Sequence, residues 1–241
     1  MAKKLGIGQQ LLHEHVAKLE HAGLVRREGD RALSLTTFGE TIAGLIDTYL
    51  FLSAYKEYFS DHKFGQMPTK FARRIGDLSA STFVKGLSGV LERWRKVQDD
   101  AQEYIYMALP EVPSVMIEGL LKKLHAQPDG AKSLTVRCLY PRNIKTGIEG
   151  ELKNQHFGEL SKANLAKVRY VKNVEIAVVL NEKQSLVFFP NLRGETDMTC
   201  MFFGERSDVA PKSIRFHEWC LDYFRYRWHE NDPVLLDSSM I

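Results

Sequence analysis

LGIGQQLLHEHVAKLEHAGLVRREGDRALSLT, residues 5–36, has the pattern of a helix-turn-helix followed by a two-stranded hairpin. Gly6 and Gly8 favour a tight turn, after which a helix is expected to begin near Gln9. The helix is expected to stop at residues 21–23, where Gly23 is a natural left-handed terminator. Its apolar residues recur at the three- and four-residue spacing of a buried stripe: Leu12, Val16 and Leu19.

The opposite face of this helix carries side chains that read base edges or hold phosphates. Glutamine suits adenine, lysine suits phosphate or guanine, and glutamate accepts from cytosine. Two β-type segments follow at residues 24–27 and 32–36, and residues 28–31 (EGDR) form the turn between them. Arginines on this hairpin are within reach of a flanking phosphate or the minor groove. The sequence therefore assigns the DNA contacts to Gln9, Gln10, His13, Glu14 and Lys18 on the helix and to Arg26, Arg27 and Arg31 on the hairpin.

The run LGIGQQLLHEHVAKLEHAGLVRR, followed by LTTFGE, resembles the winged-helix domain of prokaryotic transcription regulators. The resemblance implies double-stranded DNA as a partner. Such a domain normally has another helix ahead of this one, yet only four residues precede Leu5. Either the native start lies upstream of Met1, or the packing comes from elsewhere. Residues 1–31 hold six Lys or Arg against four Asp or Glu. The affinity for DNA is therefore expected to depend on where the individual charges lie rather than on the net charge of the domain.

The composition is that of an ordinary globular chain, with 44% hydrophobic and 26% charged residues. Its 241 residues suffice for a small module and a second domain. No apolar run approaches the ~20 residues that cross a membrane, and the basic N-terminus lacks a signal-type apolar core, so a cytoplasmic protein is expected. Cys138, Cys200 and Cys220 are widely spaced and fit a reducing compartment. All three are expected to be buried and to behave as small hydrophobic residues. The alternative is a redox or metal site formed by the three cysteines, although the sequence has no C-x-x-C spacing.

Residues 38–59 are predicted to form one long helix, capped by Thr37 and with Glu40 in its first turn. In regulators of the resembled kind such a helix often pairs with its twin in a dimer, which matches two-fold operators. Packing on the chain's own second domain explains the pattern equally well. The apolar stripe of this helix consists of Ile42, Leu45, Ile46, Tyr49, Leu52 and Tyr55.

The second half of the chain alternates between helix-like and strand-like patterns after a break at residues 60–68. Helices are expected at 83–97, 114–126 and 214–228, the last as an aromatic lid on the core. Strands are expected at 103–109, 134–140, 174–180, 186–189 and 198–203, with a long polar connection at 141–166. The predicted fold class is α/β (α+β overall). The predicted domains are 1–37 (winged helix-turn-helix, its first helix missing), 38–60 (connecting or dimerisation helix), 61–232 (α/β effector-binding domain) and 233–241 (tail).

The order of elements over residues 60–230, with the words DHKFGQMPTKFARRIGDL and FFGERSD, is similar to the effector-binding half of archaeal winged-helix (ArsR-like) regulators. The resemblance is to the methanogenesis-regulator and TrmB types, whose sensor domain is distantly like phospholipase D. Phospholipase D chemistry needs H-x-K-x-x-x-x-D, and no histidine here has Lys two positions later, since Lys63 directly follows His62.

Other catalytic patterns are also missing from the sequence, among them G-x-S-x-G, a Walker loop, H-E-x-x-H and a Gly-rich dinucleotide turn. His13 and His15 point to different sides of their helix, which is poor metal geometry. No enzymatic activity, cofactor or metal is therefore expected.

An effector pocket is expected among strand ends and loops, where Arg and Lys favour a small anionic ligand. The sequence thus predicts a homodimeric DNA-binding transcription regulator whose C-terminal domain senses such an effector or mediates assembly. The alternative is a protein-interaction module, or an enzyme with a phospholipase-D-like fold, in which the winged helix makes only protein contacts. The candidate effector-binding residues are Arg137, Tyr140, Arg142, Arg169, Lys172, Arg193 and Phe203.

Overall fold

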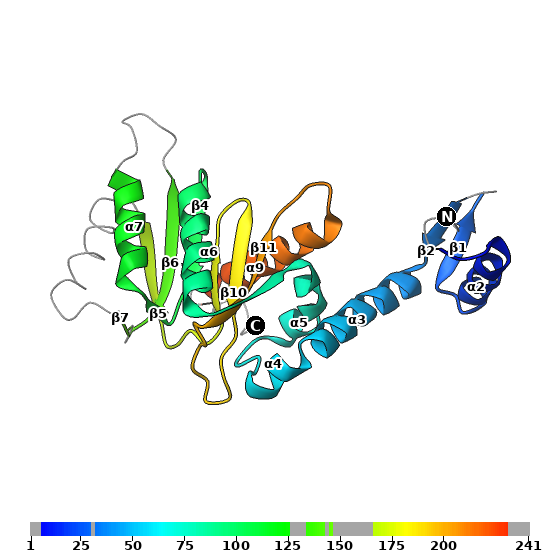
Figure 1. The fold of residues 1–241 in the computed structure, drawn as a ribbon, viewed down its shortest axis with the longest axis horizontal. Helices are drawn as coiled ribbons and strands as arrows, with labels where there is room; N and C mark the ends of the chain where they lie inside the picture. The colour runs from blue at the N-terminus through cyan, green and yellow to red at the C-terminus, as the bar shows by residue number, and fades with distance from the viewer. Residues whose placement is uncertain (1–5, 30–31, 126–133, 143–144, 147–165, 231–241) are drawn as a thin grey trace, which may run out of the picture.

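A long helix, α3 (Thr37–Ala54), joins a small N-terminal unit to a larger α/β body in the computed structural model (Figure 1). The N-terminal unit consists of helix α2 (Gln9–His21) and a wing of two antiparallel strands, β1 (Val25–Glu28) and β2 (Ala32–Leu35). It stands at the outer end of α3, away from the body. The structure describes residues 6–29, 32–125, 134–142, 145–146 and 166–230.

Local sequence signals account for the ends of these elements. The helix predicted near Gln9 begins there, and Gly23, with φ of 70°, follows its end. Gly29, with φ of 67°, lies in the turn of the wing. The cap of α3 is Thr36 rather than the predicted Thr37, because the Thr36 hydroxyl accepts from Gly39 N at 3.0 Å and donates to Gly23 O at 2.6 Å. This residue therefore ties the start of α3 to the end of α2.

The helix predicted over residues 38–59 is two helices. α3 ends at Ala54, and α4 (Lys56–Asp61) begins after Tyr55, whose φ of −113° and ψ of 26° leave the helical region. The break turns the α4 aromatics toward the sheet, where the rings of Tyr58 and Phe59 lie 5.3 and 6.3 Å from that of Phe202. We call residues 37–62, which include the C-cap residue His62, the α3–α4 arm.

A mixed seven-stranded sheet forms the centre of the body, in the order β3-β11-β10-β9-β4-β6-β8. β4, β6 and β8 are parallel, and the other neighbours are antiparallel. The edge strands β3 and β8 were not predicted, because short and partly polar segments give weak strand patterns. β3 takes the first residues of the helix predicted over 83–97, which begins only at Leu87. The bounds are β3 (Thr82–Lys85), β4 (Tyr104–Ala108), β6 (Thr135–Pro141), β8 (Ala166–Val171), β9 (Ala177–Leu180), β10 (Gln184–Phe188) and β11 (Cys200–Glu205), with a separate parallel pair β5 (Glu111–Val112) and β7 (Lys145–Thr146).

Helices cover both faces of this sheet (Figure 1). α6 (Leu87–Asp100) and α7 (Ser114–His125) pack on one face, around a core that includes Trp94. The other face is covered by α9 (Pro211–His229), α5 (Thr69–Ala72), the 3-10 helix η1 (Ile75–Ala80) and the α3–α4 arm. This arrangement confirms the mixed α/β class. None of the described helices combines the length and apolar character needed to span a membrane.

The closing helix α9 is the predicted aromatic lid, since Phe216, Trp219 and Phe224 are each fully buried. It also buries His217, whose Nδ1 lies 2.7 Å from Ser185 Oγ and whose Nε2 lies 3.2 Å from Tyr104 Oη. Burial, aided by Arg206, lowers the pKa of His217 to about 4. This imidazole is therefore neutral in the folded protein near pH 7.

Acidification should destabilise the protein through His217. The unfolded chain takes up this proton near pH 6.5, whereas the folded chain resists it until about pH 4. Stability from this group is thus complete above pH 6.5 and is lost as the pH falls, by about 2 kcal/mol between pH 7 and pH 5. Urea unfolding at both pH values measures the loss. His217→Gln should remove most of the pH dependence, and an equally steep loss in that variant would contradict the assignment.

Candidate nucleic-acid interface and sensor cavity

The polar face of α2 is exposed along its length, and no residue of this helix is buried. The predicted groove residues Gln9, Gln10, His13, Glu14 and Lys18 are all exposed. Gln10 Nε2 lies 3.5 Å from Glu14 Oε1, which is a weak hydrogen bond along the helix. Because the unit stands away from the body (Figure 1), this face is accessible to a large partner.

The wing arginines are already paired within the N-terminal unit. Arg27 donates to both carboxylate oxygens of Glu20, at 2.7 and 3.2 Å, and this contact raises the pKa of Arg27. Arg26 lies 3.2 Å from both Glu28 and Ser34. The Ser34 hydrogen bond, and then Arg26, lower the pKa of Glu28. A phosphate would have to compete with these internal partners.

Arg31 lies outside the described residues, as do most of the predicted polar connection and the 233–241 tail. Unlike the paired wing arginines Arg26 and Arg27, Lys18 makes no ion pair within the part of the chain that the structure describes.

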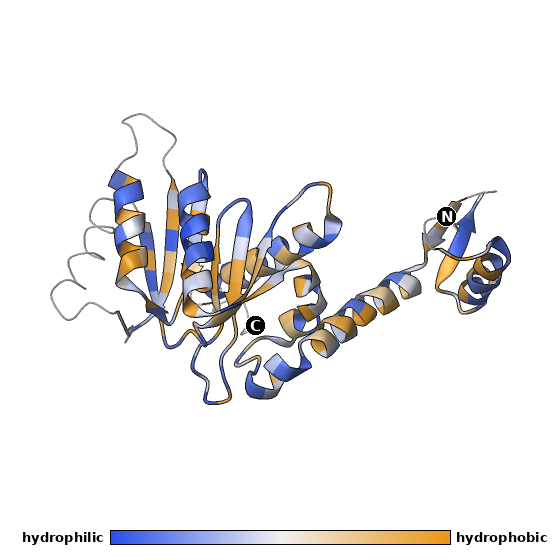
Figure 2. Cartoon of the chain, viewed as in Figure 1, coloured by the Kyte–Doolittle hydropathy of each residue, from blue (hydrophilic) through white to orange (hydrophobic). Residues whose placement is uncertain are grey.

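Apolar side chains are also exposed outside the body. In α2 the stripe predicted to be buried is only partly covered, since Leu12 and Val16 are half-buried and Leu19 is 41% exposed. Apolar residues of α3, which is largely apolar in Figure 2, are likewise open to solvent, and three of them belong to the stripe predicted for this helix. We call this surface the α3 stripe; it consists of Phe38, Leu45, Ile46, Tyr49 and Leu50, which are 51–72% exposed.

The seven residues predicted to bind an effector do not share one pocket. Tyr140 and Phe203 lie in the core between the sheet and α6–α7. Arg137 and Arg169 lie on the opposite face, with their guanidinium groups 5.5 and 4.6 Å from the ring of Trp228. The sheet separates the two groups because neighbouring residues of a strand point to opposite faces. The prediction of a single pocket was therefore wrong. The remaining three, Arg142, Lys172 and Arg193, are exposed.

A cavity of about 400 Å³ does lie near the ends of β4 and β6, where an α/β sheet often binds ligands. Its lining includes two carboxylates, Glu111 and Glu195, and none of the seven predicted residues. Like charges disfavour an anion here, so this cavity does not match the expected anionic ligand.

A second cavity, of about 560 Å³, lies between the α3–α4 arm and the β3–β11 edge of the sheet. We call it the arm cavity. The sequence patterns missed it because β3 was not predicted and because its two walls are far apart in the chain. The arm contributes Ala54, Tyr55, Glu57, Tyr58, Asp61 and His62, and the sheet side contributes Phe83, Lys85, Gly86, Thr199 and Cys200.

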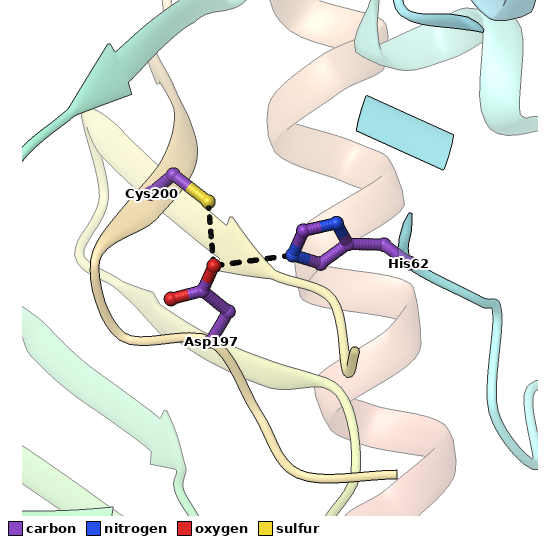
Figure 3. A group of neighbouring side chains, drawn as sticks. All are labelled: His62, Asp197 and Cys200. Atoms are coloured by element: carbon purple, nitrogen blue, oxygen red, sulfur yellow. Dashed lines mark hydrogen bonds and ion pairs between the residues drawn. The ribbon is translucent and has the colours of Figure 1, made fainter. Parts of the chain in front are cut away.

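His62 and Cys200, which both line the arm cavity, meet Asp197 beside it, and we call these three residues the His62 cluster (Figure 3). Asp197 Oδ2 lies 3.2 Å from His62 Nε2 and 3.1 Å from Cys200 Sγ. Its other oxygen accepts from Thr199 N and Oγ1, at 2.8 and 2.7 Å. Burial opposes ionisation of Asp197, but the hydrogen bonds from Thr199 and Cys200, together with the contact to His62, outweigh it and lower the pKa of this carboxyl.

The order of these three groups is not that of a nucleophilic triad. In such a triad the imidazole contacts the nucleophile, whereas here the carboxylate lies between the imidazole and the thiol. Burial, and then Asp197, raise the pKa of Cys200 to about 12, which keeps the thiol protonated. A protonated thiol is a poor nucleophile. The sequence predicted Cys200 to be a buried hydrophobe, with a redox or metal site of the three cysteines as the alternative, and no local motif signals its contact with Asp197 and His62.

No protein-family model matches the sequence, and none of the curated proteins matches it. Among solved structures the chain shows similarity to TrmBL2, described as an archaeal chromatin protein with a novel mode of DNA binding. The two are 11% identical with a TM-score of 0.46, over 95% of this chain and 84% of that one. Since this similarity is too distant to assign a function, the proposals below rest on the chain's own residues.

Proposed function

We propose that this chain is a DNA-binding transcription regulator whose N-terminal unit contacts duplex DNA and whose body senses an effector. The observation that carries the proposal is the position of α2 and the wing. A helix with an exposed polar face stands beside an antiparallel hairpin, at the far end of α3. A single helix fits the major groove of B-DNA, and a hairpin beside it reaches the flanking backbone.

The exposed side chains divide into two roles in this proposal. Gln10 and His13 lie on the outer face of α2 and would contact base edges. Lys18 would contact a phosphate directly, and Arg27 would do so by exchanging Glu20 for the phosphate. The internal pairing of the wing arginines explains why a small charge surplus is compatible with binding: the cations are held in place before DNA arrives.

Lys18→Ala should weaken binding to every duplex and lower the slope of log K against log salt by about 0.9, the contribution of one phosphate contact. Gln10→Ala should instead reduce the preference between sequences, by about 1–3 kcal/mol at one base pair. Fluorescence anisotropy with genomic and scrambled duplexes at several salt concentrations measures both effects.

Lys183→Ala is the matched control for lysine removal, because Lys183 is exposed on the β9–β10 turn of the body. If Lys18→Ala and Lys183→Ala gave equal slopes of log K against log salt, Lys18 of α2 would not contact the DNA backbone. Wild-type protein that shows no salt-sensitive binding to any duplex would end the DNA proposal.

A protein-interaction module is the second candidate, and a specific observation favours it. Leu11, Leu19, Leu33 and Leu35 of the N-terminal unit are 37–46% exposed, and a protein partner that covered them would gain from burying this apolar surface. In that case the unit would show no salt-dependent affinity for duplexes. The anisotropy experiment therefore separates the two candidates.

A homodimer follows from the α3 stripe in our proposal. A helix face without charged residues can pack against the same face of a second copy through a two-fold axis. Two wings related in this way would match the symmetry of a palindromic operator.

The arm cavity is the effector site in this proposal. Tyr55 and His62 come from the arm, while Phe83 and Cys200 come from the sheet, so an occupant touches both parts. A ligand that contacts both walls favours one position of the arm over others, and the arm carries the DNA-binding unit.

A further inference from the structure

We infer that the His62 cluster binds a divalent transition-metal ion of the zinc class. Its ligand atoms are an imidazole nitrogen, a carboxylate oxygen and a thiol sulfur, and all three lie within 4.8 Å of one another. They come from distant parts of the chain, since His62 follows α4, Asp197 precedes β11 and Cys200 begins β11. Figure 3 shows the imidazole and the thiol converging on the same carboxylate oxygen.

In a neutral His62, a ring nitrogen without a proton faces the Asp197 carboxylate, so two hydrogen-bond acceptors face each other. Its Nδ1 lies 2.8 Å from the carbonyl oxygen of Tyr58, and a carbonyl only accepts, so Nδ1 carries the proton. In a neutral imidazole Nε2 is then an acceptor, yet it faces Asp197 Oδ2 at 3.2 Å. A positive charge between the two resolves the conflict. Metal-bound histidines commonly show this arrangement, with the second ring nitrogen donating to a backbone carbonyl.

The thiol brings a second kind of ligand atom to the same carboxylate oxygen. Without a metal ion the protonated Cys200 thiol donates to Asp197 Oδ2, with Sγ 3.1 Å away. A metal ion that replaces the thiol proton uses all three groups, and the proton is released to solvent.

The N–O and S–O spacings fit a tetrahedral ion after a small outward movement of the ligands. Bonds of about 2.0–2.3 Å to nitrogen, oxygen and sulfur place two ligands of tetrahedral zinc about 3.4–3.6 Å apart. The observed N–O and S–O separations, 3.2 and 3.1 Å, are slightly shorter. The mixed N, O and S set selects zinc or a similar transition metal over magnesium or calcium, which prefer oxygen ligands.

Neighbouring groups hold the ligands in place. Thr199 orients the Asp197 carboxylate through two hydrogen bonds, at 2.7 and 2.8 Å. The Tyr58 ring stacks on the His62 imidazole with centroids 3.8 Å apart and planes at 17°. Cys200 is held in β11 opposite Lys85 of β3. Ligands that are oriented before the ion arrives lose less entropy on binding.

Three protein ligands leave one position of a tetrahedral ion for water or an effector atom. His62 and Cys200 both line the arm cavity, so that position belongs to the cavity proposed above as the effector site. The ion would also join the arm to the sheet, because His62 ends the arm while Asp197 and Cys200 belong to the body. This regulatory consequence rests on the proposed function, whereas metal binding itself does not.

Titration of the metal-stripped full-length chain with Co²⁺, without DNA, tests the site. We expect one Co²⁺ per chain, with visible bands of a tetrahedral ion and a thiolate-to-cobalt charge-transfer band, and displacement of both by Zn²⁺. Cys200→Ser should abolish the charge-transfer band and weaken binding at least tenfold. Asp197→Asn should lose binding yet stay folded, because an amide can accept from Thr199 and donate to the Nε2 lone pair.

Two control variants complete the design. Cys220→Ser changes a cysteine that is fully buried elsewhere, and His13→Ala changes an exposed histidine of α2; both should bind Co²⁺ as the wild type does. Absence of the cobalt bands at a hundredfold excess of metal would overturn the inference. Undiminished binding by Asp197→Asn and Cys200→Ser would overturn it as well. If the chain binds DNA in a salt-sensitive way but binds no metal ion, the metal site is refuted while the proposed function is retained.

Discussion

Gly76→Ala is expected to lower the free energy of unfolding by about 1–3 kcal/mol, the usual cost of forcing extra volume into a packed site. A Cβ on Gly76 would lie 2.4 Å from Thr48 N and 2.6 Å from Asp47 C, which are backbone atoms of α3. Backbone atoms inside a helix cannot move aside as a flexible side chain can. The substitution should therefore push α3 away from η1.

The joint around Gly76 explains why this displacement matters. Asp47 forms ion pairs with Lys212 at 3.0 Å and with Arg215 at 2.8 Å, both on α9. Thr48 Oγ1 donates to Arg73 O at 3.2 Å. These bonds and Gly76 all hold the same turn of α3 against the body, so the substitution strains them together.

Gly44→Ala is the matched control on the same helix. No atom lies within 4 Å of a Cβ at Gly44, so alanine should stabilise the protein, by up to about 1 kcal/mol from helix propensity. Urea unfolding of both variants measures the difference. A Gly76→Ala protein as stable as the wild type would show that α3 is not held closely at this point.

Local patterns were enough to predict most of the elements near the N-terminus. Gly23 and Gly29 mark the end of α2 and the turn of the wing, because positive φ angles suit glycine. The aromatic spacing of α9 likewise predicted a buried lid. The break at Tyr55 was not predictable, because it follows from packing of Tyr58 and Phe59 on the sheet rather than from any helix-breaking residue.

The candidate sites, like the elements, were predictable only where a local sequence pattern defines them. The exposed face of α2 follows from helical periodicity, which needs only neighbouring residues. The His62 cluster joins residues separated by 135 positions, and no spacing rule connects them. The predicted effector set failed for a related reason: it collected basic residues near strands without knowing which face of the sheet each would occupy.

The α3 stripe should control both assembly and DNA affinity. Tyr49, at 72% exposed, is the most open member of this apolar surface. A carboxylate there would be buried without a partner in a two-fold helix pair, which is costly. Tyr49→Glu should therefore give a monomer by light scattering. Since two linked half-site contacts gain about 10²- to 10⁴-fold in affinity, the variant should lose that factor on a palindromic duplex.

Binding of Tyr49→Glu to a duplex with a single half-site should stay unchanged, because the N-terminal unit itself is untouched. Tyr49→Phe keeps the apolar surface and should remain dimeric. Ser60→Glu adds the same charge on α4, outside the stripe, and should also remain dimeric. A wild-type chain that is monomeric at every concentration would remove the stripe from assembly. A Tyr49→Glu protein that stays dimeric would place the dimer contact elsewhere and leave the exposed face of α3 for a different partner.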